Sequence, residues 1–354
     1  MHVTEMQNLQ NRLIAKAADE LGIQCELLIP GCEDFLQLRK QDVSIVINKT
    51  RSHRLPLMSG LLAKNKQAAN QLLSQQGLPV PAHIVLSDSD RNEQALSFLE
   101  SVSAAGQSLV VKPLDSSGGN GVTLDVRTQQ QLAKAMKDAS AFSEQILLQQ
   151  YVQGNDYRVL VIDSKVVAVT EYSPAYLVGD GQRTIGELID DLNRQHLRQT
   201  PIGQLTLFHK LQPDDPSIVQ SLAEKGYTLD AVPETGCTVT LYSLQHTEID
   251  KVSEFSRDCT DEIHAHNQAL AIHAAQILNI DVAGIDIRCN DISIPLTSDC
   301  GGILEVNALP DFVFHVYPYE GQSRDVARRY VEYLFHQPVN EPVATSSNLQ
   351  RSVH

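Results

Sequence analysis

The 354-residue chain lacks the features that mark several common protein classes. Lys and Arg number 28 against 43 Asp and Glu, a formal net charge of −15, so the basic surface of a nucleic-acid-binding or anionic-membrane-binding protein is missing. No apolar run approaches the roughly 18–20 residues that span a bilayer. The N-terminus shows no basic segment followed by an apolar one, hence no secretory signal. We therefore expect a cytoplasmic protein with no nucleic-acid or membrane partner.

Composition and cysteine spacing indicate a reduced, globular protein. Apolar residues make up 42% and charged residues 20%, which excludes a largely disordered chain. The length reaches the upper size for one hydrophobic core, so we expect one multi-lobed, enzyme-sized unit. No CxxC pair occurs, and the thiols are expected to be reduced and mostly structural. They are Cys25, Cys32, Cys237, Cys259, Cys289 and Cys300.

Hydrophobic periodicity and turn signals predict a mixed α+β order with several hairpins rather than a regular βαβ alternation. The predicted helices cover 8–21, 64–76, 91–104, 128–139, 186–195, 217–225, 264–278 and 324–335. The predicted strands cover 44–48, 109–113, 122–126, 146–152, 157–162, 166–172, 282–288 and 303–307.

A lysine and a glycine-rich loop form a first candidate for phosphate binding. Lys112 ends an apolar strand, and the loop SSGGNG follows at 116–121. Glycines let the backbone N–H groups close over an oligophosphate without obstruction by side chains. No GxxxxGK[ST] or GxGxxG pattern is present, so neither a P-loop nor a dinucleotide fingerprint is indicated. Taken alone, the loop fits a hairpin turn and Lys112 a solvated strand end.

Two apolar strands each contain a carboxylate. Asp286 interrupts VAGIDIR, where Ile285 and Ile287 are expected to point the other way, into the core. Glu305 and Asn307 lie two residues apart on ILEVN and so share one face of the strand. Taken singly, these residues fit the polar face of an exposed sheet. Carboxylate and amide oxygens also suit Mg²⁺, and an unpaired buried charge is costly, so two apolar strands that each contain a carboxylate make a metal site a candidate.

The order of these elements is itself informative. A helix lysine, Lys66, precedes the strand lysine, the glycine loop, a hinge strand and the acidic strands, and this order resembles the ATP-grasp superfamily of ligases. Its ATP-grasp modules in cyanophycin synthetases and fused bacterial glutathione synthetases look most similar, across about 50–320. The stretches that carry the resemblance are VVKPLDSSGGNGVTLDVRT, LLQQYVQGNDYRVLVI, SPAYLVGDGQRTIGELI, GYTLDAVPETG, DVAGIDI and GGILEVNALPDFVFH.

The resemblance implies an α+β, ATP-grasp fold in which two subdomains clasp ATP. By this analogy a short N-terminal α/β segment covers 1–60, and the ATP-grasp domain covers 61–338, with a lid subdomain at about 105–160. A flexible C-terminal tail covers 339–354.

It also implies roles for individual residues. ATP would be bound by Lys66, Lys112, Ser116, Ser117, Gly118, Gly119 and Gly121 at its phosphates, by Gln149, Gln150, Tyr151 and Val152 at adenine, and by Asp156 at ribose. Asp286, Glu305 and Asn307 would hold two Mg²⁺ ions, with Mn²⁺ able to substitute. Lys112, Lys210 and Arg288 are the catalytic candidates, and Tyr172, Lys210 and His315 are the substrate candidates.

The chain departs from the family pattern at two places. The hinge reads Gln149-Gln150, where relatives commonly carry Glu followed by a basic residue. A basic residue common before the PA of the PA…VGDG stretch is replaced by EYS at 171–173. Arg158, Arg183 or Arg288 could supply the missing cation.

The implied activity is ATP-dependent joining of a small-molecule acid to an amino acid or amine, with release of ADP and phosphate. One alternative is a ligase that phosphorylates an enolic oxygen of a mycosporine-type acceptor and makes an imine or enamine. The alternative from another class is a non-catalytic nucleotide-binding regulatory protein. Family analogy also allows a homodimer.

Overall fold

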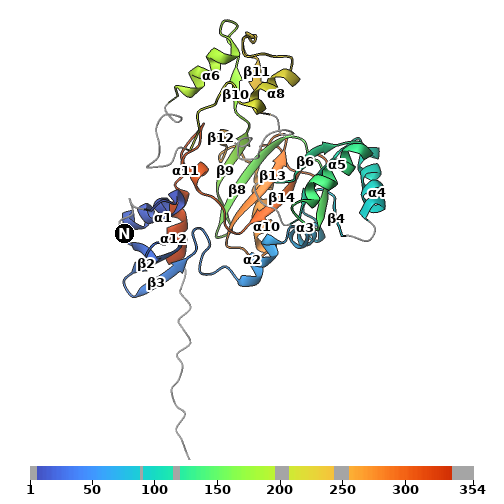
Figure 1. Cartoon of the computed structure of the whole chain (residues 1–354). Coiled ribbons are helices and arrows are strands. Elements are labelled where there is room, and N and C mark those ends of the chain that lie inside the picture. Colours follow the sequence, from blue (N-terminus) through green and yellow to red (C-terminus); the bar gives the residue numbers. More distant parts are fainter. Residues whose placement is uncertain (1–5, 88–90, 115–119, 196–206, 243–254, 337–354) are drawn as a thin grey trace, which may run out of the picture.

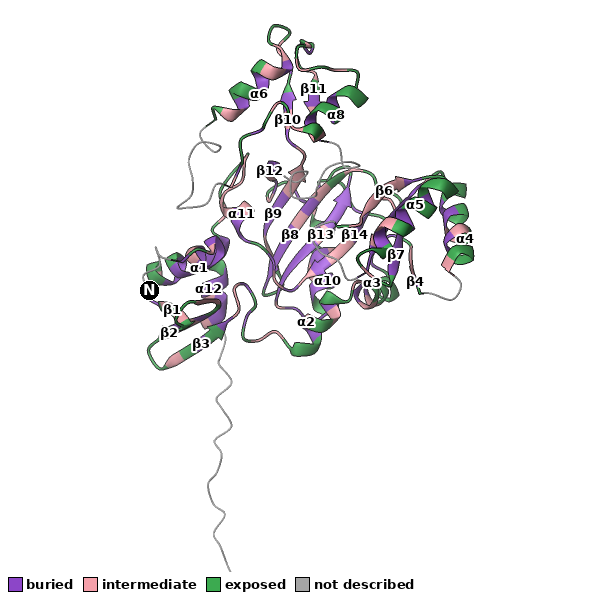
Figure 2. Cartoon of the chain, in the orientation of Figure 1, coloured by how far each residue is buried: buried purple, intermediate pink, exposed green. Residues whose placement is uncertain are grey.

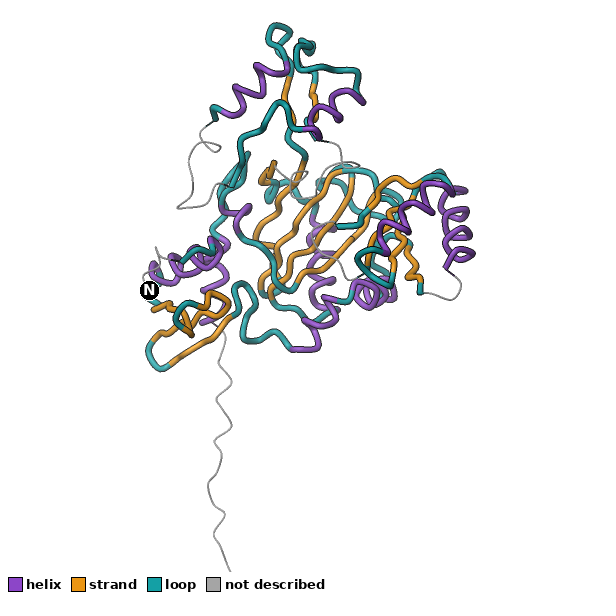
Figure 3. Tube along the Cα trace, in the orientation of Figure 1, coloured by secondary structure: helices purple, strands orange, loops and turns teal. Residues whose placement is uncertain are grey.

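The computed structural model describes residues 6–87, 91–114, 120–195, 207–242 and 255–336. These residues form a five-stranded, a four-stranded, a three-stranded and a two-stranded sheet, surrounded by helices (Figure 1). Figure 3 shows the five-stranded sheet at the centre, with a separate layered unit on each side and a third above it. No helix in this described part is long and apolar enough to cross a membrane.

The central sheet has the strand order β12-β9-β8-β13-β14, and every neighbouring pair is antiparallel. The predicted strands at 157–162 and 166–172 are confirmed and form a hairpin, because β8 and β9 pair around the turn at Asp163 and Ser164. The strands are β8 (Asn155–Ile162), β9 (Lys165–Ser173), β12 (Phe255–Asp258), β13 (Val282–Cys289) and β14 (Gly301–Asn307).

One face of this sheet is largely apolar and is covered by helices, with the ion pair of Glu171 and Arg257 near one end of it. It packs against α10 (Ala265–Ile277) and α3 (Lys66–Gln75), next to α2 (Leu57–Lys64). The predicted orientation of Ile285 and Ile287 is confirmed, since their exposed fractions are 0% and 1%. Figure 2 shows these central strands as largely buried.

The opposite face of the sheet is divided in two along the strands. Its lower half, formed by Leu160, Ile162, Ala168 and Val282, is buried under the N-terminal unit. Its upper half carries charged and polar side chains instead. Strand alternation places Asp156, Arg158, Thr170, Tyr172, Asp286 and Arg288 there.

The N-terminal unit is closed by a helix from the other end of the chain. Asn8 caps α1 (Leu9–Glu20) by accepting from the backbone N–H of Asn11, and α1 packs on the three-stranded sheet and on α12 (Val326–His336). Sequence patterning predicted one strand here, but the unit has three: β1 (Gln24–Ile29), β2 (Cys32–Lys40) and β3 (Val43–Ile47).

Shared burial predicts that this unit and the central sheet unfold together. Ile14 is fully buried in the core that joins α1 to α12. We expect Ile14→Ala to lower the free energy of unfolding by about 2–5 kcal/mol, through lost burial and a residual cavity. Urea unfolding followed by far-ultraviolet circular dichroism and by tyrosine fluorescence should give coincident, shifted transitions. A separate early transition with the main one unchanged would contradict the shared core.

A second α/β unit lies on the other side of the central sheet. Its four strands have the order β4-β7-β5-β6 and pack on α4 (Arg91–Ala104) and α5 (Gln129–Ser140). The expected lid range of about 105–160 differs from this unit, because β4 pairs with β7 and β8 belongs to the central sheet. The strands are β4 (His83–Leu86), β5 (Leu109–Pro113), β6 (Thr123–Val126) and β7 (Ile146–Gln150).

A small third unit extends from the end of β9. It contains β10 (Tyr176–Val178) paired with β11 (Thr238–Thr240), and the helices α6 (Ile185–Asn193) and α8 (Pro216–Glu224). Thr184 forms a capping box with Glu187 at the start of α6, so the TIGEL segment begins a helix. The unit has its own apolar core and lies above the polar half of the central sheet (Figure 1).

Candidate functional site

The charged end of the central sheet brings the predicted metal ligands together. Asp286 and Glu305 are direct partners across the β13–β14 ladder, so both carboxylates leave the sheet side by side. Asn307 donates through Nδ2 to Asp286 Oδ2 at 3.0 Å, which leaves its Oδ1 for another contact. Two carboxylates and an amide oxygen are the ligands that Mg²⁺ accepts, usually together with water and substrate phosphates.

Arg158 faces this carboxylate pair from β8. Its Nε donates to Asp286 Oδ1 in a short contact, and its Nη2 donates to Asp286 Oδ2 at 3.1 Å. A Cβ at Gly284 would lie 3.0 Å from Arg158 Cδ, so the absence of a side chain there makes room for the arginine. Although burial opposes the charge, Asp286 raises the pKa of Arg158 further above its usual value. The arginine therefore stays a cation beside the candidate metal site.

The two predicted lysines lie on the other side of the same space. Lys66 Nζ lies 3.7 Å from Glu305 Oε2, and Lys112 Nζ donates to Gln149 Oε1 at 2.9 Å. Burial, reinforced by the charge of Lys66 and opposed by Glu305, lowers the pKa of Lys112 to about 8. Lys66 of α3 and Lys112 of β5 are thus close enough to each other and to Glu305 for their charges to interact.

The glycine-rich loop is only partly within the described part of the chain. The predicted phosphate ligands Ser116, Ser117, Gly118 and Gly119 lie outside the described residues. Gly121 follows β5 and has φ +71°, where a side chain is strained. A Cβ on it would also lie 2.9 Å from Pro113 and 2.7 Å from Phe142, so this end of the loop requires glycine.

The hinge residues divide between the cleft and the rear of the sheet. Gln149 is 2% exposed, and because its Oε1 accepts from Lys112, its Nε2 remains a buried donor with no partner among the described residues. Gln150 instead accepts from the backbone N–H of Ala82 at 3.3 Å, on the β4 side. Gln149 therefore offers a hydrogen-bond donor to a ligand, where a glutamate would offer only acceptors.

Asp156 and Arg288 form a second ion pair on the ladder next to Arg158 and Asp286. The two pairs are crossed, because β8 carries the acid of one pair and the base of the other, opposite Arg288 and Asp286 of β13. Burial raises the pKa of Asp156, and Arg288 partly offsets this effect. Asp156, the predicted ribose ligand, is therefore the ion-pair partner of Arg288, which was predicted to be catalytic.

Two of the three predicted substrate residues lie beside Arg158. The ring of Tyr172 packs edge-on against Phe314 at 5.8 Å, and burial raises the pKa of its hydroxyl. His315, on α11 (Val313–Val316), is 1% exposed and its Nδ1 pairs with Thr170 Oγ1 at 2.7 Å. Burial and, to a lesser extent, Arg158 lower the pKa of His315 to about 3, so the ring is neutral.

The second ring nitrogen of His315 is available to contact a ligand. Its Nε2 is buried and has no hydrogen-bond partner among the described residues. The third predicted residue, Lys210, is exposed and lies two residues after Phe208, whose ring packs on Phe314 and Tyr319. The structure therefore places the segment that carries Lys210 near α11, but it does not bring this lysine into the cluster around Arg158.

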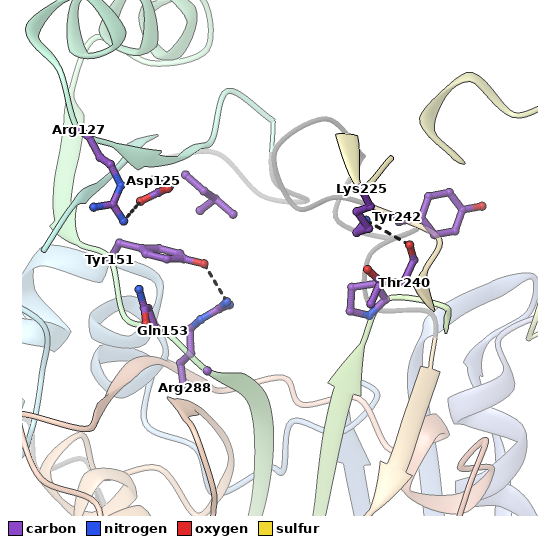
Figure 4. A pocket seen from close by; sticks show the side chains of 11 residues that line it. Asp125, Arg127, Tyr151, Gln153, Lys225, Thr240, Tyr242 and Arg288 are labelled. Carbon is purple, nitrogen blue, oxygen red and sulfur yellow. Dashed lines mark hydrogen bonds and ion pairs between the residues drawn. The ribbon is translucent and has the colours of Figure 1, made fainter. Parts of the chain in front are cut away.

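A cavity of about 490 Å³ opens between the hinge, β6 and the small third unit. Figure 4 shows Tyr151, Gln153 and Arg288 on one side and Lys225, Thr240 and Tyr242 on the other. Arg127 lines it too and is paired with Asp125 at 2.7 Å. Arg288 lines the cavity and is paired with Asp156, so the cavity adjoins the polar end of the central sheet.

Comparison with known proteins agrees with this arrangement. Residues 63–174 match the RimK-like ATP-grasp domain. The chain contains an ATP-grasp domain. Its ATP-grasp fold also resembles the crystal structure of a bifunctional glutathione synthetase from Pasteurella multocida, with a TM-score of 0.72 at 25% identity. That likeness covers 94% of this chain and 45% of the other, and it confirms the predicted α+β fold.

Curated relatives show the same resemblance over longer stretches. Cyanophycin synthetase of Trichormus variabilis is 37% identical over 286 residues, which cover 81% of this chain and 30% of that protein. The bifunctional glutathione biosynthesis protein of Listeria innocua is 26% identical over 334 residues, which cover 94% of this chain and 42% of that protein. The predicted family resemblance is confirmed, and this chain spans less than half the length of these relatives.

The sequence alone did not decide which arginine replaces the basic residue that relatives carry near 171–173. Of the three arginines considered, Arg183 is 45% exposed and pairs with Asp180 and Asp191 in the small unit, and Arg288 is held by Asp156. Arg158 alone of these three contacts a predicted metal ligand. The cross-strand register of β8 and β13, which no spacing along the chain reveals, decides between them.

Proposed function

We propose that the chain is an ATP-dependent ligase that joins a small-molecule acid to an amino acid or amine, with release of ADP and phosphate. The observation that carries the proposal is the convergence of Asp286, Glu305 and Asn307 with Lys66 and Lys112 at one end of the sheet. Similarity to cyanophycin synthetase and to bifunctional glutathione synthetases supports the same chemistry.

The residues present fit ATP with divalent cations. Asp286, Glu305 and the free amide oxygen of Asn307 would hold two Mg²⁺ ions, or Mn²⁺, whose positive charge would offset charge on the transferring phosphoryl group. Lys66 and Lys112 would bind the phosphates, and the glycine-rich loop would cover them. The buried donor of Gln149 and the backbone of the hinge would bind the base.

The proposed reaction has two steps. An oxygen of the acid attacks the γ-phosphorus of ATP and ADP leaves, which gives an acyl phosphate. The amine nitrogen then attacks the acyl carbon, phosphate leaves through a tetrahedral intermediate, and an amide and one proton remain. Phosphorylation is needed because a carboxylate is a poor electrophile. Arg158, paired with Asp286, would stabilise the charge that develops on the reacting oxygens.

ADP release tests the proposal directly. We would incubate the protein with Mg-ATP and a panel of amino acids, dipeptides and mycosporine-type acceptors, and analyse products by mass spectrometry. A product with the mass of acid plus amine minus water, formed with stoichiometric ADP, would identify the substrates. ATP binding with no acceptor-stimulated ADP release across expanding panels would favour the non-catalytic alternative. Absence of ATP binding would contradict the ATP-dependent ligase.

The lowered pKa of Lys112 predicts a pH dependence of nucleotide binding. The ammonium form binds phosphate, and in the free protein it is lost as pH rises through about 8. Phosphate binding favours that form, so affinity for Mg-ADP should fall by up to about tenfold per pH unit above this pKa. Lys112→Arg keeps its charge throughout and should flatten the profile between pH 7 and 9.5 in calorimetric titrations. An equal slope in both proteins would contradict the assignment.

A further inference from the structure

The hinge is tied to β13 by a single arginine side chain. Arg288 is 11% exposed, and its Nε donates to the carbonyl oxygen of Val152 at 2.7 Å. Its Nη1 donates to both carboxylate oxygens of Asp156, at 2.8 and 2.7 Å. One guanidinium group therefore fixes a hinge peptide and the carboxylate that follows the hinge.

The same guanidinium also contacts Tyr151, the hinge residue that precedes Val152. It lies over the ring of Tyr151, 5.4 Å from the centroid, and its Nη2 donates to the Tyr151 hydroxyl at 3.4 Å (Figure 4). These contacts occupy each nitrogen of the guanidinium group. Each guanidinium nitrogen of Arg288 thus donates to the hinge or to Asp156.

Close backbone contact provides a second anchor. Gly154 has φ +119°, and a Cβ there would lie 2.4 Å from the carbonyl carbon and oxygen of Cys289. Only glycine allows the hinge to approach β13 this closely. Arg288 and Gly154 thus hold residues 151–156 against one end of β13.

We infer that Arg288 is a positioning residue for the nucleotide, which orients the Val152 peptide toward the base and the Asp156 carboxylate toward the ribose. This inference rests on the proposed function and replaces a direct role of Arg288 in phosphoryl transfer. Donation from the one Nη1 to both Asp156 oxygens restricts the carboxylate, and each oxygen keeps a lone pair for a ribose hydroxyl. Arg158, beside Asp286, is left as the cation for the reacting groups.

The inference predicts a loss of affinity rather than of chemistry. Arg288→Met should raise the Kd and KM for Mg-ATP by about tenfold to a hundredfold, the value of charge-assisted hydrogen bonds, with the effect falling mainly on KM. Arg288→Lys keeps the charge but replaces the three nitrogens that contact Val152, Asp156 and Tyr151 by one, so it should recover part of the affinity. Arg328→Met, which breaks an exposed arginine pair with Glu332 on α12, is the matched control and should behave as the wild type.

Ribose analogues distinguish positioning from a general structural effect. Wild-type protein should bind 2′-deoxy- or 3′-deoxy-ATP more weakly than ATP, and Arg288→Met and Asp156→Asn should both lose this discrimination. Melting temperatures and circular dichroism of the variants check the fold. A fall in kcat with unchanged KM, or intact ribose discrimination in folded Arg288→Met, would overturn the inference while leaving the ligase proposal standing. A wild-type protein that binds no nucleotide would overturn the proposed function, and this inference with it.

Discussion

Replacement of Glu305 by Gln is expected to reduce kcat/KM for ligation by about 10³-fold. The change removes one of two adjacent carboxylates, and a bound metal ion contributes several kcal/mol to stabilisation of the transition state, with each 1.4 kcal/mol equal to a factor of ten. Glu305 is preferable to Asp286 for this test. Asp286 is the partner of Arg158, and its removal would leave that half-buried cation unpaired, whereas Glu305 has the weaker contact with Lys66 at 3.7 Å.

The control for this experiment lies on the opposite face of the same sheet. Glu171 pairs with Tyr157 across the β8–β9 ladder and binds Arg257 at 2.7 Å, away from the charged cluster. Glu171→Gln should retain activity, and isothermal titration with Mg²⁺ in the presence of ADP should show weaker metal binding for Glu305→Gln alone. Undiminished turnover by a folded Glu305→Gln protein would contradict the proposed metal site.

Substitution of Arg158 by Gln should lower kcat by about 10²–10³-fold, the cost of losing one preorganised donor to developing charge. The effect on KM for ATP should be small, because the Lys66–Lys112 side of the cleft is unchanged. A loss in kcat with little change in KM is the reverse of the result expected for Arg288→Met, which should act mainly on KM. Single-turnover measurement of ADP formation at saturating ATP would locate the loss in the chemical steps.

Two further variants make the Arg158 test decisive. Arg158→Lys keeps the charge without the fork and should be intermediate. Arg257→Gln removes an arginine from the other face of the sheet and should leave kcat near the wild-type value. A folded Arg158→Gln protein with normal kcat would contradict this role of Arg158 and would leave Lys112 and Lys210 as the catalytic candidates.

Much of the fold could be predicted locally because its signals are local. The apolar strands around Asp286 and Glu305 and the hairpin at 157–172 follow from alternation and turn chemistry, and β8, β9, β13 and β14 confirm them. The strands β1 and β2 were missed. No residue of β1 is buried, and the burial of β2 alternates irregularly, with Phe35 exposed, so no apolar face with a period of two marks them in the sequence.

The sequence by itself determined the order of the elements, the two lysines and the acidic strands, since these depend on residue type and on short spacings. Tertiary structure alone decided which charges meet. The pairing of β8 with β13 sets Arg158 against Asp286 and Arg288 against Asp156, 128 and 132 residues apart in the chain. It also decided that α12 completes the N-terminal core. Cross-strand register and helix docking minimise the free energy of the whole packed chain, so no local pattern can specify them.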